Sequence, residues 1–440
     1  MTTAAWLMAV ASALCAVALV MTIVNLFIYR RSPLVTTLIT AGTTTGTKAG
    51  NTTRDSNPSA PANNNSNNNN STSSAPLVSV CVPARNEESN IEACARSVLA
   101  SDEPDIELIV YDDQSTDATP RILQSLIDEE LRSAGPNGTS RLRRAPTVPL
   151  PAGWNGKQHA CWRMSQTARG QWLLFTDADV RFTPDAVRRS VAQARRLNAG
   201  LLSTFPRQEL GTIGEALIVP MIFFILFSYL PMPRMRSSKD PATSAGCGQF
   251  LLVKRNVYDA FGGHAAFQDT MHDGIKMPRA VRRAGFRSDL FDGSDLCHVR
   301  MYRGLTQTWR GFAKNAFEGL GSAGLLVLIT ILHAVGHVLP WLVIELQAVR
   351  WSANDATVLS SWVGQFDRTA ILFAACAVTM AISQRLILAL RLRQGSLGIL
   401  IALVHPLGVI AMTSVQWYSF YLHLTGKRAW RGRIAAGAPS

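Results

Sequence analysis

Long runs without a charged residue, at both ends of the chain, constrain its fold more than any other feature. Residues 1–29 contain no Asp, Glu, Lys or Arg, and Arg30 and Arg31 follow directly. The apolar stretch is long enough for the ~20 residues that cross a bilayer as a helix. A cleaved signal peptide carries its positive charge before the apolar core, not after it. We therefore predict an uncleaved membrane anchor over 1–31 whose C-terminal end faces the cytoplasm.

Three further uncharged runs lie in the last third of the chain, at 319–344, 369–384 and 395–426. They predict C-terminal transmembrane helices over 319–426, followed by a basic tail at 427–440. If the middle of the chain is cytoplasmic, three C-terminal crossings would place this tail outside, against the positive-inside rule, whereas an even number would keep it inside. The first run contains Pro340 and is either a crossing or a re-entrant segment, so we predict three or four crossings.

Two segments between these runs differ from the rest of the chain. Residues 32–76 include 26 Asn, Ser or Thr and no aromatic residue. Such a composition cannot bury a core, so we predict a disordered linker. Residues 216–233 are uncharged and rich in Phe, Ile and Pro, which predicts a helix in the membrane interface or, as the alternative, a buried core helix. The remaining soluble portion, 77–318, is long enough for one α/β domain.

Short apolar runs alternate with helical patterns through this domain. The predicted strands are 77–82, 106–111, 171–176 and 199–204. The predicted helices are 90–99, 117–131, 158–169 and 184–197, with Ser115 or Thr116 available to cap the second. This alternation predicts the α/β class with a doubly wound, mostly parallel sheet. In such sheets ligands bind at the carboxyl ends of the strands.

Acidic side chains follow three of the predicted strands. Glu87 follows the first, Asp112 and Asp113 end the second, and Asp177 and Asp179 follow the third. Alternate residues of an extended chain point the same way, so the last pair can reach one point. Paired carboxylates suit Mg²⁺ or Mn²⁺ that also bridges phosphates, although a lone Asp-x-Asp is as readily a solvated turn.

Asp112, Asp113 and Glu87 each allow a ligand-binding and a structural interpretation. Asp112 and Asp113 are suited to hydrogen bonding with a nucleoside, or to capping the helix that follows. Glu87 either joins that pocket or stabilises a helix N-terminus.

Two further segments carry residues suited to group transfer. Lys157 begins a predicted helix and could hold a phosphate there, or be an ordinary surface lysine. Asp273 precedes an amphipathic basic helix and could take a proton from a hydroxyl group, with Asp269 and His272 as rivals for that role.

Residues near the C-terminal membrane segments remain ambiguous. Arg310 could stabilise a leaving diphosphate and Trp309 could pack on a sugar or lipid, but an aromatic-basic belt at the membrane explains both equally well. His333 and His337 are interpreted as packed or lipid-interface residues, not metal ligands. The seven cysteines show no C-x-x-C spacing, which fits a reduced compartment without a zinc site.

Together these motifs resemble the inverting family 2 glycosyltransferases with the GT-A type fold, over about residues 77–310. Among them, the membrane-bound bacterial group linked to hopanoid and carotenoid glycosylation is the most similar in its membrane arrangement. The matching strings are VPARNEE at 82–88, DDQSTD at 112–117, GWNGK at 153–157, TDAD at 176–179 and GCGQFLLVKRNVYDAFGGH at 246–264.

The resemblance implies an enzyme that takes a nucleotide-sugar donor, with a UDP-sugar favoured, and an amphiphilic, isoprenoid-like lipid acceptor, with no nucleic-acid partner. It implies a multi-pass protein of the inner membrane with a cytoplasmic catalytic domain. The implied nucleotide-sugar residues are Pro83, Arg85, Glu87, Asp112, Asp113, Lys157 and Asp177. The implied metal ligands are Asp179 and Asp177, holding Mg²⁺ or Mn²⁺. The implied catalytic residues are Asp273 and Arg310, with Gly248, Gln249 and Trp309 on the acceptor side.

Two departures from the family pattern affect these assignments. Asp273-Gly274 stands where the family often has an acidic pair, which leaves the base uncertain by one residue. Processive members carry Gln-x-x-Arg-Trp, whereas Gly311 follows Gln307 and Arg310 here, which favours transfer of a single sugar.

Two other functions remain as alternatives. An aspartyl-nucleophile phosphatase also uses Asp-x-Asp after a strand, but it needs Thr or Val where Arg181 stands. A non-catalytic membrane protein that binds nucleotides would keep the motifs without turnover. No G-x-G-x-x-G follows the first strand, which argues against a dinucleotide oxidoreductase.

Overall fold

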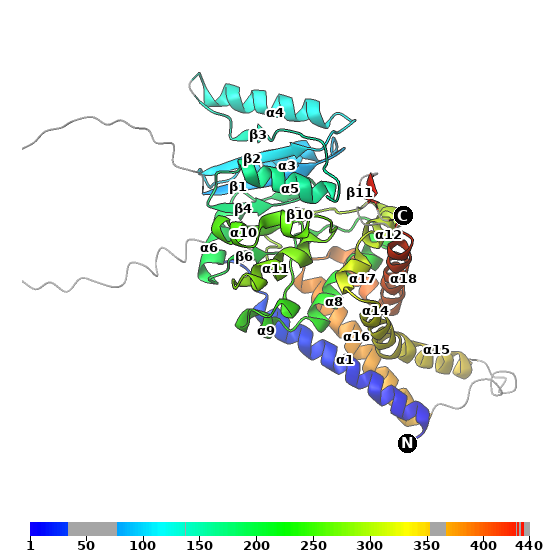
Figure 1. Ribbon diagram of the computed structural model, residues 1–440. Coiled ribbons are helices and arrows are strands. Elements are labelled where there is room, and N and C mark those ends of the chain that lie inside the picture. The colour runs from blue at the N-terminus through cyan, green and yellow to red at the C-terminus, as the bar shows by residue number, and fades with distance from the viewer. Residues whose placement is uncertain (34–76, 137, 353–366, 428, 431–432, 435–440) are drawn as a thin grey trace, which may run out of the picture.

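The computed structural model describes residues 1–33, 77–136, 138–352, 367–427, 429–430 and 433–434. Residues 34–76 of the predicted linker and most of the predicted basic tail therefore lie outside the described residues, whereas Ser32 is buried. The described chain forms an α/β domain that sits at one end of a group of long helices, with the N-terminus at the far end of those helices (Figure 1).

A seven-stranded sheet forms the centre of the α/β domain. Its strands, in order across the sheet, are β3 (Leu142–Arg144), β2 (Ile106–Asp112), β1 (Val78–Ala84), β4 (Trp172–Phe175), β8 (Leu251–Lys254), β6 (Leu201–Ser203) and β9 (Ser288–Leu290). β8 runs antiparallel to both of its neighbours, and the other neighbouring pairs are parallel. The predicted mostly parallel α/β sheet is confirmed. A second, three-stranded sheet joins β5 (Val180–Phe182), β10 (Cys297–Val299) and β7 (Arg207–Gln208).

Helices cover both faces of the large sheet because its central strands are apolar on both sides. Val80 and Val82 of β1 point into one core and Cys81 into the other, and every residue of β1 and β2 is buried. The first core is closed by α3 (Ile91–Leu99), α4 (Thr119–Ala134) and α6 (Ala186–Arg196). The second is closed by α5 (Gly156–Thr167), α10 (Arg255–Ala260) and α11 (Asp273–Arg283).

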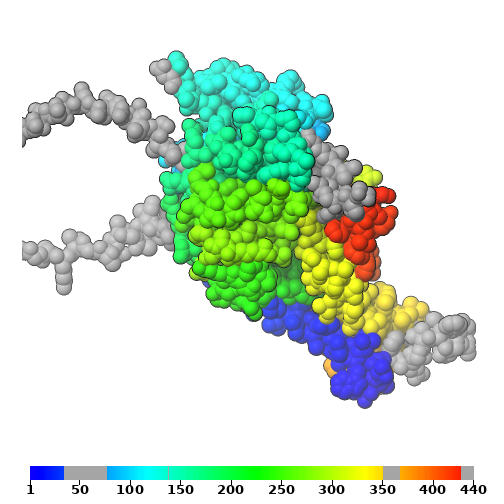
Figure 2. Space-filling model, viewed as in Figure 1, coloured from blue at the N-terminus to red at the C-terminus, as the bar shows by residue number. Residues whose placement is uncertain are grey.

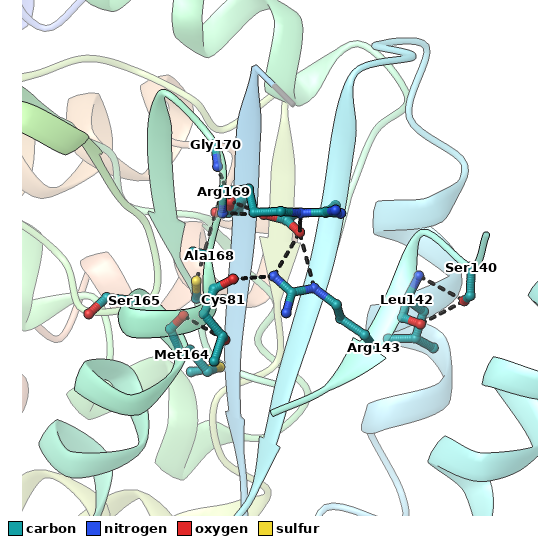
Figure 3. Close-up of polar contacts among 12 residues, drawn as sticks. Cys81, Ser140, Leu142, Arg143, Met164, Ser165, Ala168, Arg169 and Gly170 are labelled. Carbon is teal, nitrogen blue, oxygen red and sulfur yellow. Dashed lines mark hydrogen bonds and ion pairs between the residues drawn. The ribbon is translucent and has the colours of Figure 1, made fainter. Parts of the chain in front are cut away.

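A buried carboxylate ties the starts of β1 and β2 to the neighbouring loop. Glu107 is 3% exposed and accepts hydrogen bonds from Ser79 Oγ at 2.6 Å and from the Arg169 backbone N–H at 2.6 Å. Arg143 Nη2 donates to it at 2.8 Å, and the Arg143 and Arg169 side chains approach each other across these strands (Figure 3). Burial raises the pKa of Glu107, but these hydrogen bonds outweigh it and hold the pKa below its usual range. The strand starts are thereby held in register, which positions the opposite, carboxyl edge.

Three described helices are long and apolar enough to cross a membrane. They are α1 (Thr3–Ile28), the continuous helix Ala323–Val349 and α16 (Arg368–Arg391). α1 and α16 lie side by side (Figure 1). α1 also lies on the outer surface of the molecule (Figure 2), where Trp6 and Phe27 are 62% and 65% exposed, as lipid contact requires.

The uncharged run through Pro340 forms a helix of membrane-crossing length, which agrees with the first of its two predicted alternatives. The helix through Pro340 is continuous and contains a π-helical turn, η3 (Ala334–Val338), between α14 (Ala323–His333) and α15 (Leu339–Ser352). Pro340 has no N–H for the Gly336 carbonyl, and Cys15 Sγ of α1 lies 3.0 Å from that oxygen as a donor. The bend lies instead between α17 (Gly395–Ala402) and α18 (His405–Leu424), which meet at 96° and count as a fourth crossing only if they form one span.

The segment 216–233 forms parts of three short helices, α7 (Ile213–Ile218), α8 (Met221–Tyr229) and α9 (Met232–Ser237). Phe224 and Phe227 of α8 are fully buried in a cluster shared with α1, α16 and α18. Phe224 also contacts His333 and His337, which are themselves buried. This packing agrees with the buried-helix alternative, and the interfacial placement stays a prediction.

One buried carboxylate fastens the α/β domain to two of the long helices. Asp292 follows β9 and is 0% exposed. Its Oδ2 pairs with Arg31, just after α1, at 3.4 Å and with Arg391, at the end of α16, at 2.5 Å. The domain is therefore held against the bundle by charge pairing as well as by apolar contact.

Candidate active site

The acidic residues predicted at three strand ends lie at one edge of the sheet. β2 and β4 both pair with β1 in parallel, with Ala84 opposite Asp112 and Cys81 opposite Phe175. Asp112 and the segment 177–179 therefore flank the end of β1. Two strand spacings separate their strands, which is roughly 10 Å.

The loops that follow β1 and β2 are joined to each other by hydrogen bonds. The Asn86 N–H donates to Ser115 Oγ at 2.9 Å, and the Thr116 N–H donates to Asn86 Oδ1 at 2.8 Å. Asn86 and Gln114 take φ values of 54° and 55°, in the left-handed region that non-glycine residues rarely adopt. Strained backbone held by a network of this kind is typical of functional loops.

This network corrects the predicted cap of α4. Ser115 and Thr116 bond to Asn86 and do not cap the helix, and the Thr119 N–H donates to Asp117 Oδ1 at 3.0 Å. Asp117 can do so because it lies two residues before Thr119, whereas the other two residues belong to the loop network.

Four of the predicted nucleotide residues lie next to this network. Arg85 Nη1 donates to the Asp113 carbonyl at 2.5 Å and lies 3.7 Å from Asp113 Oδ2. Asp112 Oδ1 accepts from the Ser115 N–H at 3.1 Å. Asp112 and Asp113 are 4% and 2% exposed, and Pro83 is buried within β1. Arg85 and the two carboxylates thus form one rigid polar group at the end of β1 and β2.

Lys157 joins two carboxylates that come from distant parts of the chain. It lies in the first turn of α5, which Asn155 caps by accepting from the Lys157 N–H at 3.0 Å. Its Nζ lies 2.7 Å from Asp177 Oδ1 and 3.0 Å from Asp273 Oδ2. Burial lowers the pKa of Lys157, but the two carboxylates outweigh it and raise that pKa well above its usual value. The side chain is therefore a charged ammonium shared by the end of β4 and the start of α11.

The same charge acts on Asp273. Burial raises the pKa of Asp273, but Lys157, with smaller contributions from His264 and His272, lowers it below its usual range overall. Asp273 is 5% exposed and is ionised at neutral pH.

Asp179 has a buried carboxylate oxygen that no described residue satisfies. Its Oδ1 is buried and accepts no hydrogen bond from any described residue. Burial, then the charges of Asp177 and Glu87, raise the pKa of Asp179 to about 7, against the opposing effect of Lys157. A divalent cation between Asp177 and Asp179 would satisfy this oxygen, so the residues fit the predicted Mg²⁺ or Mn²⁺. Within the described ranges no three His, Cys, Asp or Glu side chains could hold a metal by themselves, so phosphate oxygens or water would complete its ligands.

Three glycines let the segment 246–248 lie directly against Asp273. A Cβ on Gly248 would lie 2.9 Å from Asp273 Cγ and nearer still to Oδ1. A Cβ on Gly274 would lie 2.7 Å from the Gly246 carbonyl oxygen. Gln249, which follows, is 5% exposed, and its carbonyl accepts from Thr176 Oγ1 at 2.7 Å. Any side chain at Gly248 would displace the carboxylate.

The rivals for the proton-accepting role differ in their surroundings. Asp269 is exposed and forms no hydrogen bond or ion pair with a described residue. His272 is half-buried, and a Cβ on Gly319 would lie 3.5 Å from its Nε2. Of the three, Asp273 alone pairs with Lys157 in the described structure.

Arg310 and Trp309 lie on α12 (Gly304–Ala313), outside this cluster of ion pairs. Arg310 is exposed and pairs with no described residue. Trp309 is half-buried, with its ring 6.4 Å from that of Tyr418 on α18, which agrees with the alternative of a packed belt residue. Position 311 is a glycine for a steric reason, because a Cβ there would lie 2.5 Å from the Tyr302 hydroxyl. A tryptophan at this position would displace Tyr302.

Two residues near Asp273 were not predicted. Glu318 accepts a hydrogen bond from the Met271 N–H at 3.3 Å through either carboxylate oxygen. Its position directly before an uncharged run was the sequence feature that could have identified it. His264 is fully buried, with its Nδ1 2.7 Å from Tyr258 Oη, and ends the string at 246–264. Burial lowers the pKa of His264 to about 3, against a smaller effect of Asp273.

Comparison with known proteins supports the predicted resemblance. The family model described as glycosyl transferase family 2 matches residues 79–262. The 4,4'-diaponeurosporenoate glycosyltransferase of Staphylococcus aureus (strain USA300) is 24% identical over 365 residues, which cover 81% of this chain and 87% of that protein. The protein of the same description from Staphylococcus haemolyticus (strain JCSC1435) is 25% identical over 267 residues, 59% of this chain and 66% of that one.

Solved structures that match part of this chain include a mannosyltransferase from Pyrobaculum calidifontis in complex with GDP-mannose and Mn²⁺. The two sequences are 19% identical and the TM-score is 0.47. The match covers 80% of this chain and 87% of the mannosyltransferase chain. Glucosyl-3-phosphoglycerate synthase from Mycobacterium tuberculosis is 20% identical, with a TM-score of 0.33. That match covers 55% of this chain and 78% of the synthase chain.

Proposed function

We propose that this chain moves one sugar from a nucleotide-sugar donor to a hydroxyl or carboxyl group of an amphiphilic, isoprenoid-like lipid, because the glycosyl transferase family 2 model matches residues 79–262. The observation that carries the proposal is the ion-pair cluster in which Lys157 reaches both Asp177 and Asp273. It places one cation between a carboxylate suited to a donor-bound metal and a carboxylate suited to accept a proton. A UDP-sugar is the first donor to test.

A lipid acceptor is favoured by how directly the site is connected to the membrane helices. The short helix α13 (Ala316–Leu320) carries Glu318 and Gly319, which lie against the segment just before Asp273. The long apolar helix begins at Ala323, three residues after α13. An acceptor hydroxyl at the membrane surface therefore has a short path to Asp273. We further propose a multi-pass protein of the inner membrane with this domain in the cytoplasm, since Arg30 and Arg31 follow α1.

The proposed chemistry is a direct displacement with inversion. The Asp273 carboxylate accepts the proton of the acceptor hydroxyl, whose oxygen forms a bond to the anomeric carbon as the bond to the diphosphate breaks. Lys157 stabilises the negative charge that grows on the leaving diphosphate, and Arg310 would contribute if α12 brings it to the donor. Arg85, Asp112 and Asp113 bind and orient the nucleoside, and Gly248 leaves room for the Asp273 carboxylate.

A divalent cation is proposed as the cofactor. Asp179 and Asp177 would hold it, and Glu87 adds negative charge nearby. When bound, Mg²⁺ or Mn²⁺ neutralises phosphate charge as a Lewis acid.

A donor screen tests the proposal. The full chain is purified in detergent and incubated with Mn²⁺, a set of nucleotide sugars and a long-chain isoprenoid alcohol, and released nucleotide diphosphate is measured. We expect release that depends on the acceptor and on one sugar. Phosphate release from phosphoesters without any nucleotide sugar would instead support the phosphatase alternative. Binding of nucleotide diphosphate without turnover across all acceptors would support a binding protein.

The acceptor class can be tested with the same assay. A carboxyl acceptor is already ionised at neutral pH, whereas a hydroxyl must lose its proton during attack. Asp273→Asn should therefore reduce transfer to an isoprenoid alcohol far more than transfer to an isoprenoid acid. Equal loss with both acceptors would show that Asp273 does more than accept a proton.

A further inference from the structure

The ion pairs of Lys157 have a consequence for the order of events at the site. We propose that Lys157 is an exchangeable internal cation: without donor it occupies the carboxylates of Asp177 and Asp273, and it leaves them for the diphosphate when metal and nucleotide bind together. This inference rests on the proposed function and assigns Lys157 a second position in the same site.

The first observation is that Lys157 is the one described cation that forms an ion pair with these carboxylates. In the described part of the chain no other Lys, Arg or His side chain pairs with Asp177 or Asp273. Arg181, four residues after Asp177, donates to the backbone carbonyls of Ala178 and Val180 at 3.1 Å. Arg85 is engaged with Asp113. The ammonium thus stands where a metal-bound donor would otherwise supply the positive charge.

The second observation is that the pairing is incomplete. Asp179 lies two residues from Asp177, yet its buried Oδ1 receives no hydrogen bond from any described residue. A single ammonium 2.7 Å from Asp177 satisfies one carboxylate of the pair and leaves the other unpaired. A divalent cation could satisfy both, so the arrangement with Lys157 is the weaker of two available states.

The third observation concerns movement. The Lys157 backbone is held at the first turn of α5 by the Asn155 cap, so the Cα has little freedom. The four-carbon stem is flexible, and its end can shift several ångströms by rotamer changes alone. The Asp177 side chain is 33% exposed, against 7% for Asp273 and 14% for Lys157. Metal and phosphate can therefore reach the cluster from the Asp177 side and draw the ammonium outward.

Exchange has two effects that a fixed ligand would not have. Before donor binding, Lys157 competes with a metal ion for Asp177, so metal alone should bind poorly. After exchange, Lys157 binds phosphate, so the nucleotide should bind well and Asp273 should face the acceptor without a cation on Oδ2. Removing the charge of Lys157 should therefore change the two affinities in opposite directions.

The test measures both affinities in the full-length protein in detergent. Lys157→Met removes the charge and keeps most of the stem, and Lys157→Arg keeps the charge. Lys239→Met, at an exposed lysine, is the matched control for loss of one positive charge. The affinity for Mn²⁺ alone is measured by electron paramagnetic resonance of free Mn²⁺, and the affinity for UDP and GDP at saturating Mn²⁺ is measured by titration calorimetry.

We expect Lys157→Met to bind Mn²⁺ alone on the order of tenfold more tightly and the nucleotide diphosphate on the order of tenfold more weakly, the size of one charge-assisted hydrogen bond. Lys157→Arg and Lys239→Met should stay within about threefold of wild type for Mn²⁺. Weaker nucleotide binding with unchanged or weaker Mn²⁺ binding would overturn the exchange and leave Lys157 a phosphate ligand only. A wild-type protein that binds neither UDP nor GDP with Mn²⁺ would overturn the proposed function itself. If Lys157→Met does not fold, Lys157→Gln provides the same comparison.

Discussion

Adding one methyl group at Gly248 should strongly reduce transfer without unfolding the protein. The new Cβ would lie 2.9 Å from Asp273 Cγ, where two carbon atoms prefer about 3.5–4.0 Å. Asp273 must then move by roughly 1 Å, because its helix and the segment 246–248 are packed backbone against backbone at Gly246 and Gly274. A displacement of this size in a reacting group can cost about a hundredfold in rate, or about 2.7 kcal/mol of transition-state stabilisation.

The assay for Gly248→Ala is release of nucleotide diphosphate from the donor identified in the screen, with an isoprenoid alcohol as acceptor. We expect kcat to fall about a hundredfold and the affinity for the nucleotide diphosphate to stay close to wild type. Gly324→Ala is the matched control, since a Cβ at Gly324 meets nothing within 4 Å. A Gly248→Ala protein with unchanged Tm and a kcat within threefold of wild type would refute the positional argument for Asp273.

Three other predictions concern single carboxylates. Asp179→Ala should leave the fold intact but weaken Mn²⁺ binding in the presence of UDP at least tenfold by titration calorimetry, and unchanged binding would remove Asp179 from the metal site. Asp273→Asn should abolish transfer to an alcohol while donor binding persists, whereas Asp269→Asn, at an exposed carboxylate, should behave as wild type; the reverse result would show that the base is misassigned. Glu215 is buried, and burial raises its pKa, but hydrogen bonds from Arg300 and from backbone N–H groups lower that pKa to about 2. Its stabilising effect, roughly 3 kcal/mol, is present above about pH 4.5 and lost as pH falls toward 2, so Glu215→Gln should lower Tm at pH 7 and lose that deficit in acid.

The edge of the sheet that carries the acidic pairs was predictable from local pattern. Apolar runs of strand length that end in Asp112 and Asp177 place both at the carboxyl edge, because parallel neighbouring strands end on the same side. The helix caps were less predictable. Ser115 is a good capping residue by type, but it bonds to Asn86 from another loop, and no local pattern reports that contact.

In the membrane segments too, the local sequence pattern predicted some features and missed others. Uncharged runs predicted the long helices correctly, since a bilayer requires apolar length above all. Pro340 suggested an interruption that the structure does not contain, because a π-helical turn and the Cys15 thiol compensate for the missing N–H. The 96° bend between α17 and α18 lies directly before Pro406, and a proline in the first turn is typical of the start of a new helix.

Amino-acid order alone specified an α/β domain between apolar helices, together with the identities of its acidic strand ends, because periodicity and strand direction act over short distances. Tertiary structure alone decided that Lys157, Asp177 and Asp273 meet, that Gly248 lies against the last of these, and that Asp269 remains in solvent. Those contacts join residues 20, 25 and 116 positions apart, or choose between neighbours four positions apart. They depend on how whole helices pack onto the sheet, and that packing is determined by the sum of many apolar contacts, none of which is encoded next to the residues it brings together.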